Sequence, residues 1–98
     1  MYVITVLFSI GAEHTSAFLQ AIVANARSWL KNRVADNFVC VSDRDPTDVF
    51  LYEVYDSKAA FDAHLASAHY RQFTESTPAW VIAKVINVFE RTYPRSST

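Results

Sequence analysis

Residues 50–73 read FLYEVYDSKAAFDAHLASAHYRQF, and they join an aromatic strand directly to a helix. The strand carries one carboxylate, Glu53, and the helical part carries two histidines, His64 and His69. Because residues three and four apart share one face of a helix, His64 points the same way as Phe61, toward the interior. Histidine is the side chain whose charge changes most easily near neutral pH, so His64 is a candidate proton-transfer group.

The chain around this stretch is apolar for its length. Its 98 residues suffice for one domain, and 51% of them are hydrophobic and 14% aromatic. A chain this short buries only a limited share of its own surface. We therefore expect a single domain over residues 1–93 that has an apolar subunit interface, an apolar ligand cavity or both. A flexible polar tail is expected over residues 94–98.

Charge and cysteine content exclude several classes of function. The net charge is −1 and the basic residues are scattered, which argues against a nucleic-acid partner. Cys40 is the only cysteine, so no intramolecular disulfide can form. The first residues alternate as a strand does, and they have neither the basic start nor the cleavage site of a signal peptide. No apolar run is long enough to cross a membrane. We expect a cytoplasmic protein with no membrane partner.

Hydrophobic periodicity divides the chain into strands and helices. Apolar residues at three- and four-residue steps predict a first helix over residues 12–33. Alternation with a period of two predicts strands at Tyr2–Ile10, 37–42, 49–55 and 80–91.

The second helix has clear boundary signals. Asp56 or Ser57 is expected to cap its start, and Pro78 is expected to stop it. Between these limits the helical pattern runs to Leu65, weakens over residues 66–68 and then resumes. A break over 66–68 would change the direction in which the second half of the helix points.

The resulting order, β-α-β-β-α-β, predicts a ferredoxin-like α+β fold with an antiparallel sheet and helices on one face. Strands 49–55 and 80–91 are apolar on both faces, whereas a sheet with one wet face alternates more cleanly. The helices can cover only one face. We therefore expect the other face to pack against the same face of a second copy, forming a homodimer.

Four short motifs carry a resemblance to a known family: FLYEVY at 50–55, AAFDAHL at 59–65, HY at 69–70 and NAR at 25–27. They resemble the antibiotic biosynthesis monooxygenase (ABM) family, in particular small single-domain quinol monooxygenases and isomerases of phosphorylated autoinducer-2. The resemblance implies a dimeric α+β barrel with a pocket between the sheet and the helices of each subunit. It also implies that no cofactor is needed, since many members oxidise hydroxylated aromatics with O2 and use no metal, flavin or haem.

The same resemblance marks individual site residues. His64 matches the histidine that follows the Ala-Phe pair, and His69 with Tyr70 matches a second aromatic or histidine position. Glu53 matches the strand glutamate, and Asn25 matches an asparagine of the first helix. It implies catalysis by His64 and His69, with substrate contacts from Glu53 and Asn25.

Aromatic side chains could hold a planar substrate, although packing in the core or at an interface is the favoured explanation for each of them. The candidates for substrate binding are Tyr52, Phe61, Tyr70 and Phe73.

Several of these residues also have a purely structural explanation. His64 fits a buried, hydrogen-bonded histidine as well as a general base. Glu53 needs a partner if it is buried, and an ion pair across the dimer interface is favoured over a role in orienting a histidine or a substrate hydroxyl. Asn25 is either a hydrogen-bond donor in the pocket or an amide on the helix surface.

His69 lies five residues beyond His64, so both can face one cavity only if the helix breaks near 66–68. The spacing also lacks the pattern of metal ligands on a helix, and no metal is expected.

The leading interpretation is a cofactor-independent monooxygenase that oxidises a small quinol or polyhydroxylated aromatic with O2. His64 would be the base, and His69 and Asn25 would bind or polarise oxygens. An isomerase of a small phosphorylated ketone is the alternative reaction, although it needs a cationic phosphate site and the arginines are not clustered in sequence. A stress-related ligand-binding dimer without catalysis is the alternative from a different class.

Overall fold

The computed structural model describes residues 1–31 and 36–94 of the chain. It confirms the predicted α+β order, with the second helix divided in two, and each strand lies within one residue of its expected bounds. The expected helix end at 33 and the tail beyond 94 lie outside the described residues. The elements are β1 (Tyr2–Ile10), a short 3-10 turn η1 (Ala12–His14), α1 (Thr15–Lys31), β2 (Asp36–Val41), β3 (Asp48–Tyr55), α2 (Lys58–Leu65), α3 (Ala68–Ser76) and β4 (Val81–Glu90).

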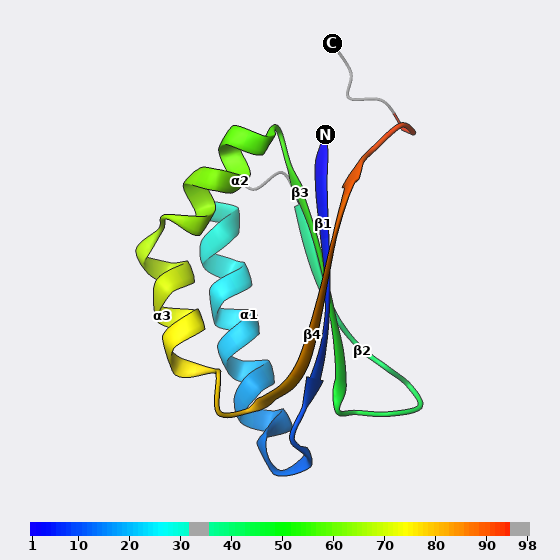
Figure 1. Cartoon of the computed structure of the whole chain (residues 1–98), viewed down its shortest axis with the longest axis vertical. Coiled ribbons are helices and arrows are strands. Elements are labelled where there is room, and N and C mark those ends of the chain that lie inside the picture. The colour runs from blue at the N-terminus through cyan, green and yellow to red at the C-terminus, as the bar shows by residue number, and fades with distance from the viewer. Residues whose placement is uncertain (32–35, 95–98) are drawn as a thin grey trace.

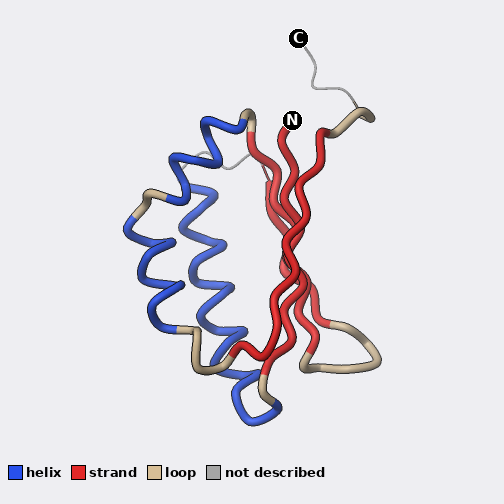
Figure 2. The backbone as a smooth tube through the Cα atoms, in the orientation of Figure 1, coloured by secondary structure: helices blue, strands red, loops and turns tan. Residues whose placement is uncertain are grey.

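The molecule has two layers, which are seen edge-on in Figure 1. Its strands form one antiparallel sheet in the order β2-β3-β1-β4, and α1, α2 and α3 all lie on the same face of that sheet. Figure 2 shows the strong twist of the sheet, with no described helix on its opposite face. None of the helices in the described residues is long and apolar enough to cross a bilayer.

Strand alternation divides the side chains of the sheet between a covered face, under the helices, and an open face. On the covered face, Ile4 of β1 lies opposite Glu53 of β3. Phe8 lies on the same face of β1, and its ring centre is 5.0 Å from that of Phe18 on α1. Phe18 and Ile22 are completely buried, so α1 is fixed against β1 by an apolar core.

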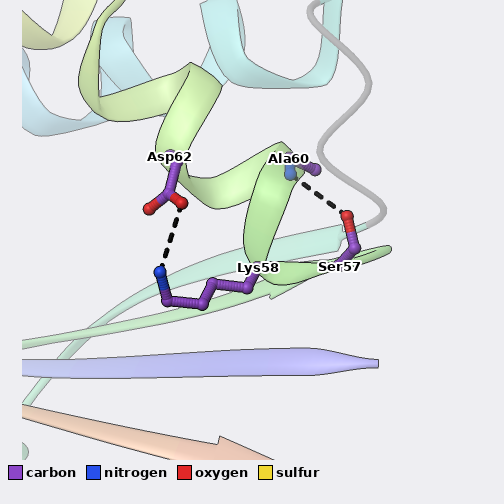
Figure 3. Close-up of polar contacts among 4 residues, drawn as sticks. All are labelled: Ser57, Lys58, Ala60 and Asp62. Carbon is purple, nitrogen blue, oxygen red and sulfur yellow. Dashed lines mark hydrogen bonds and ion pairs between the residues drawn. The ribbon is translucent and has the colours of Figure 1, made fainter.

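The start of α2 is set by a side-chain cap, shown in Figure 3. The Ser57 hydroxyl accepts a hydrogen bond from the backbone N–H of Ala60 at 3.1 Å, which confirms one of the two predicted caps. One turn further, Lys58 and Asp62 form an exposed ion pair at 3.3 Å. The cap fixes the first turn of the helix that carries His64.

The break predicted over residues 66–68 is present. α2 ends at Leu65, and the Ser67 hydroxyl accepts a hydrogen bond from the backbone N–H of Tyr70 at 3.2 Å to begin α3. α3 ends at Ser76, two residues before Pro78. The two short helices therefore approach the sheet independently, each with its own direction (Figure 1).

The open face of the sheet is apolar although no described element covers it. The register places side chains from all four strands side by side on this face, among them Phe50 opposite Leu7 and Val85 on its other side. Its large hydrophobic residues are 37–53% exposed. They are Leu7, Phe38, Phe50, Val85 and Phe89.

Candidate active site

A cavity of about 310 Å³ lies on the covered face, between the sheet and the helices α2 and α3. Inward-facing residues of β1, β3 and β4 form one wall, and the two helices form the other. The lining is mainly apolar with a few polar groups, as is typical of pockets for small organic ligands. The polar or charged lining residues are Glu53, His64, Tyr70 and Lys84.

Glu53 is the acidic group of this cavity. Its side chain lies on the covered face of β3 and is 4% exposed, and the Tyr55 hydroxyl donates a hydrogen bond to its Oε2. Burial raises the pKa of Glu53 to about 7, against the opposing effects of the Tyr55 hydrogen bond and the charge of Lys84. This location does not fit the interface ion pair that we favoured, because Glu53 is buried in the cavity of its own subunit.

His64 lies deep on the helical side of the cavity. Its ring centre is 5.7 Å from that of Tyr55 and 5.2 Å from that of Tyr70. Burial lowers the pKa of His64 to about 4, so the imidazole is neutral at neutral pH. Burial and the charge of Glu53 raise the pKa of Tyr70, which keeps this phenol protonated.

Together these groups combine one carboxyl that titrates near neutrality with a neutral imidazole and a neutral phenol. A group with a pKa near the working pH is best suited to accept and return a proton. The imidazole and the phenol can hydrogen-bond to a substrate oxygen without carrying charge. The site can therefore perform proton transfer on a hydroxylated ligand in apolar surroundings.

The aromatic residues expected at the site are divided by the sheet. Phe61, Phe73 and Tyr70 line the cavity, and Tyr70 does so beside His64. Tyr52 does not, because it is one residue from Glu53 on the same strand and therefore points to the open face. There its ring centre lies 5.7 Å from that of Phe38.

Asn25 and His69 also lie apart from His64. Both line a smaller hollow of about 200 Å³ between α1 and α3, and Phe73 borders both spaces. The helix break that would let His69 join His64 exists, but α3 presents His69 to the outside. Asn25 is 7% exposed, and its side-chain amide makes no hydrogen bond to any of the described residues. The structure thus does not bring these two residues to the cavity.

Lys84 is a cavity residue that the sequence analysis missed. It is the one cation in the apolar strand β4, VIAKVINVFE, and this isolation in a strand that lines a pocket is the signal that could have revealed it. Its Nζ lies 5.6 Å from the centre of the Phe8 ring, which is itself part of the cavity wall.

Metal ligation has no candidate in the part of the chain that the structure describes. Within residues 1–31 and 36–94, no three His, Cys, Asp or Glu side chains converge as ligands.

Comparison with known proteins identifies the family of this chain. The family model of antibiotic biosynthesis monooxygenase matches residues 1–76, and the chain belongs to that family. A solved structure from Nitrosomonas europaea, which carries the same family name, is 27% identical with a TM-score of 0.87, over 95% of this chain and 100% of that one.

More distant structures share the fold. One from Bacteriodes thetaiotaomicron is 17% identical with a TM-score of 0.90, over 99% of this chain and 94% of that one. Another, from Deinococcus radiodurans, is 20% identical with a TM-score of 0.86, over 100% and 99% of the two chains. No protein of curated function matches the chain.

Proposed function

We propose that the cavity is the active site of a cofactor-independent monooxygenase that oxidises a small hydroxylated aromatic, such as a quinol, with O2. One observation carries this proposal: a buried carboxyl with a pKa of about 7, Glu53, lies in an apolar cavity beside His64 and Tyr70. Membership of the ABM family supports the reaction class. The cavity volume suits a ligand of one or two rings, since it is at the lower end of the range for ligand pockets.

Within this proposal Glu53 is the better-matched base. A substrate phenol with a pKa near 10 loses its proton more easily to a group with a pKa of about 7 than to one with a pKa of about 4. His64, expected from the sequence to be the base, then acts as a neutral hydrogen-bonding partner of a substrate oxygen. Tyr55 is a positioning residue, because it holds the Glu53 carboxyl through its hydroxyl.

The proposed reaction balances without a further reductant. For 1,4-dihydroxynaphthalene, Glu53 removes one phenolic proton, and the naphtholate passes one electron to O2. The substrate radical and superoxide then combine at the adjacent ring carbon to form a hydroperoxide. Loss of water from this species gives 2-hydroxy-1,4-naphthoquinone, so that one oxygen atom enters the product and the other leaves as water.

The test is O2 uptake by the purified protein with 1,4-dihydroxynaphthalene, after subtraction of the spontaneous rate. We expect saturable uptake, one ¹⁸O atom from ¹⁸O2 in the product, and a loss of about 10²–10⁴-fold in Glu53→Gln. Glu75→Gln, an exposed glutamate on α3, is the matched control and should keep full activity. Uptake that survives in Glu53→Gln but disappears in His64→Ala would return the role of base to His64.

The alternative isomerase reaction has less support from the cavity. A phosphate monoester carries close to two negative charges and is usually held by several cations or by a fork of donors. Among the described residues that line the cavity, Lys84 is the only permanent cation. A non-catalytic binding function would be the conclusion if ligands bind but no O2 is consumed.

The proposed enzyme is a homodimer formed through the open face. Exposed apolar patches of this kind usually mark interfaces, and the open face collects large hydrophobic residues from all four strands. Val85→Lys places a charge in the middle of this face and should convert the dimer to a monomer in sedimentation velocity. Ala63→Lys on the exposed surface of α2 is the control. A wild-type monomer at micromolar concentration would contradict the assignment.

A further inference from the structure

We infer that Lys84 selects substrates with an anionic group, so that the ligand of the cavity is a hydroxylated aromatic carboxylate. This inference rests on the proposed function, because it names the class of ligand for the same cavity. It is carried by the position of Lys84 in the sheet, by the lack of an ion-paired carboxylate for Lys84 among the described residues and by the distribution of charge along the cavity.

The sheet register places the two charged residues of the cavity at opposite ends. Glu53 lies opposite Ile4, and Lys84 lies opposite Phe8, on the two sides of the central strand β1. Ile4 and Phe8 are four residues apart on that strand, which is roughly 13 Å at the usual rise per residue. A ligand that touches both charged ends must therefore be elongated, with about the length of two fused rings and their substituents.

Lys84 is available to bind an anion. Within residues 1–31 and 36–94 no carboxylate oxygen lies within ion-pair distance of its Nζ, and the ion pairs present involve Met1, His14 and Lys58 instead. The ammonium group is held against the cavity wall by the face of the Phe8 ring. Two apolar residues of β4 line the wall between Lys84 and the Glu53 end of the cavity. They are Ile86 and Val88.

The charges also decide the direction in which such a ligand binds. A carboxylate placed near Glu53 would be repelled whenever Glu53 is ionised, whereas at the other end it meets the ammonium of Lys84. The carboxylate therefore points to Lys84, and the hydroxyl at the opposite end of the rings points to Glu53. This orientation delivers the substrate proton to the proposed base.

Direct binding tests the inference separately from turnover. The probe is 6-hydroxy-2-naphthoate, in which the hydroxyl and the carboxylate are at opposite ends of two fused rings. Its methyl ester is the neutral partner, and 3-hydroxy-2-naphthoate, with adjacent groups, is the positional control. Affinities are measured by calorimetry on wild type, Lys84→Met, Lys84→Arg and the surface control Lys58→Met.

In the wild type we expect the 6-hydroxy acid to bind about 2- to 5-fold more tightly than its ester and than the 3-hydroxy isomer, since an exposed ion pair is worth up to about one kcal/mol. The preference should vanish in Lys84→Met and persist in Lys84→Arg and Lys58→Met. Equal affinity of acid and ester for the wild type, or a preference that survives Lys84→Met, overturns the role of Lys84 and leaves the aromatic site standing. Failure of all three ligands to bind the wild type overturns the hydroxylated aromatic carboxylate as the ligand class, whereas O2 uptake with 1,4-dihydroxynaphthalene decides the proposed function separately.

Discussion

Across β1 and β3, the two faces of the sheet have similar apolar side chains but different surroundings. On the covered face, Phe8 and Leu51 are 3% exposed beneath the helices, and the same face holds Glu53 and the cavity. On the open face, Phe50 is 37% exposed and Phe38 is 53% exposed. Neighbouring residues of one strand thus belong to two different regions, the candidate active site and the proposed dimer interface.

The contrast shows that a shift of one residue along a strand moves a side chain from one face of the sheet to the other. Tyr52 and Glu53 are adjacent in sequence, yet one lies on the open face beside Phe38 and the other lies in the cavity. Because side chains alternate, no local motif can bring both to the same site. Site assignments in such a strand therefore depend on knowing which face the helices cover.

The strongest test of the contrast exchanges a phenylalanine on each face for alanine. Phe8→Ala should lower the free energy of unfolding by about 3–5 kcal/mol, because it leaves a cavity in a packed core. Phe50→Ala should act through association, so its effect should grow with protein concentration. Urea unfolding at several protein concentrations checks both. An equal, concentration-independent loss in the two variants would mean that the open face is not an interface.

The next effect is the pH dependence of the free energy of unfolding, which Glu53 and His64 of the cavity control. The folded pKa of Glu53, about 7, is above its ordinary value of 4.5, so the folded state binds the proton more tightly and stability falls as pH rises between these values. In the wild type, Glu53 should lower the free energy of unfolding by on the order of 2–3 kcal/mol as pH rises from 4.5 to 8, and this decrease should be absent in Glu53→Gln. His64 acts in the opposite sense, since its lowered pKa costs stability as pH falls from 6.5 to 4.

Urea midpoints of wild type and Glu53→Gln across pH 4–8 separate these two effects. In the wild type they largely cancel between pH 4.5 and 6.5, whereas Glu53→Gln should show the His64 contribution alone. Glu75→Gln should follow the wild type. A variant curve parallel to that of the wild type would show that Glu53 titrates as an ordinary carboxyl.

A smaller effect is expected from the cap that orients α2 over the covered face. Ser57→Ala removes the acceptor of the Ala60 N–H and should cost about 0.5–2 kcal/mol in thermal or urea unfolding. Ser57→Asp, which can also cap, should restore most of the stability. If Ser57→Ala is neutral, the Ser57 cap does not contribute to the stability of α2.

The smallest effect compares Tyr70 of α3, which lines the cavity, with Tyr52 of β3, which lies on the open face. Tyr70→Phe removes a hydroxyl from the cavity and should weaken binding of 6-hydroxy-2-naphthoate by about 3- to 10-fold, the value of one hydrogen bond. Tyr52→Phe should leave the affinity unchanged, because Tyr52 does not line the cavity. Equal losses in both variants would mean that the ligand binds elsewhere.

Much of the fold was predictable because its signals are local. Alternation defined each strand to within one residue, Ser57 was one of two expected caps, and the weak helical pattern over 66–68 marked a real break. Phe61 and His64 share a helix face, and both line the cavity. These features depend on neighbours within about one turn of helix or a few residues of strand.

The remaining site residues depend on contacts between distant elements. Whether α3 would turn His69 toward His64 or away from it depends on how α3 packs on α1, and the structure places His69 beside Asn25 instead. Lys84 joins the cavity because β4 pairs with β1 in one register, with Lys84 opposite Phe8. No sequence window contains both partners of these contacts.

The amino-acid sequence was therefore sufficient for the family, the element order and the presence of two apolar sheet faces, because periodicity and short motifs are properties of contiguous residues. Which face the helices cover, and hence that Glu53 and Lys84 share a cavity while Tyr52 does not, follows from the pairing and packing of distant segments. The pKa of Glu53 near 7 has the same origin, since it arises from burial by elements far apart in the chain.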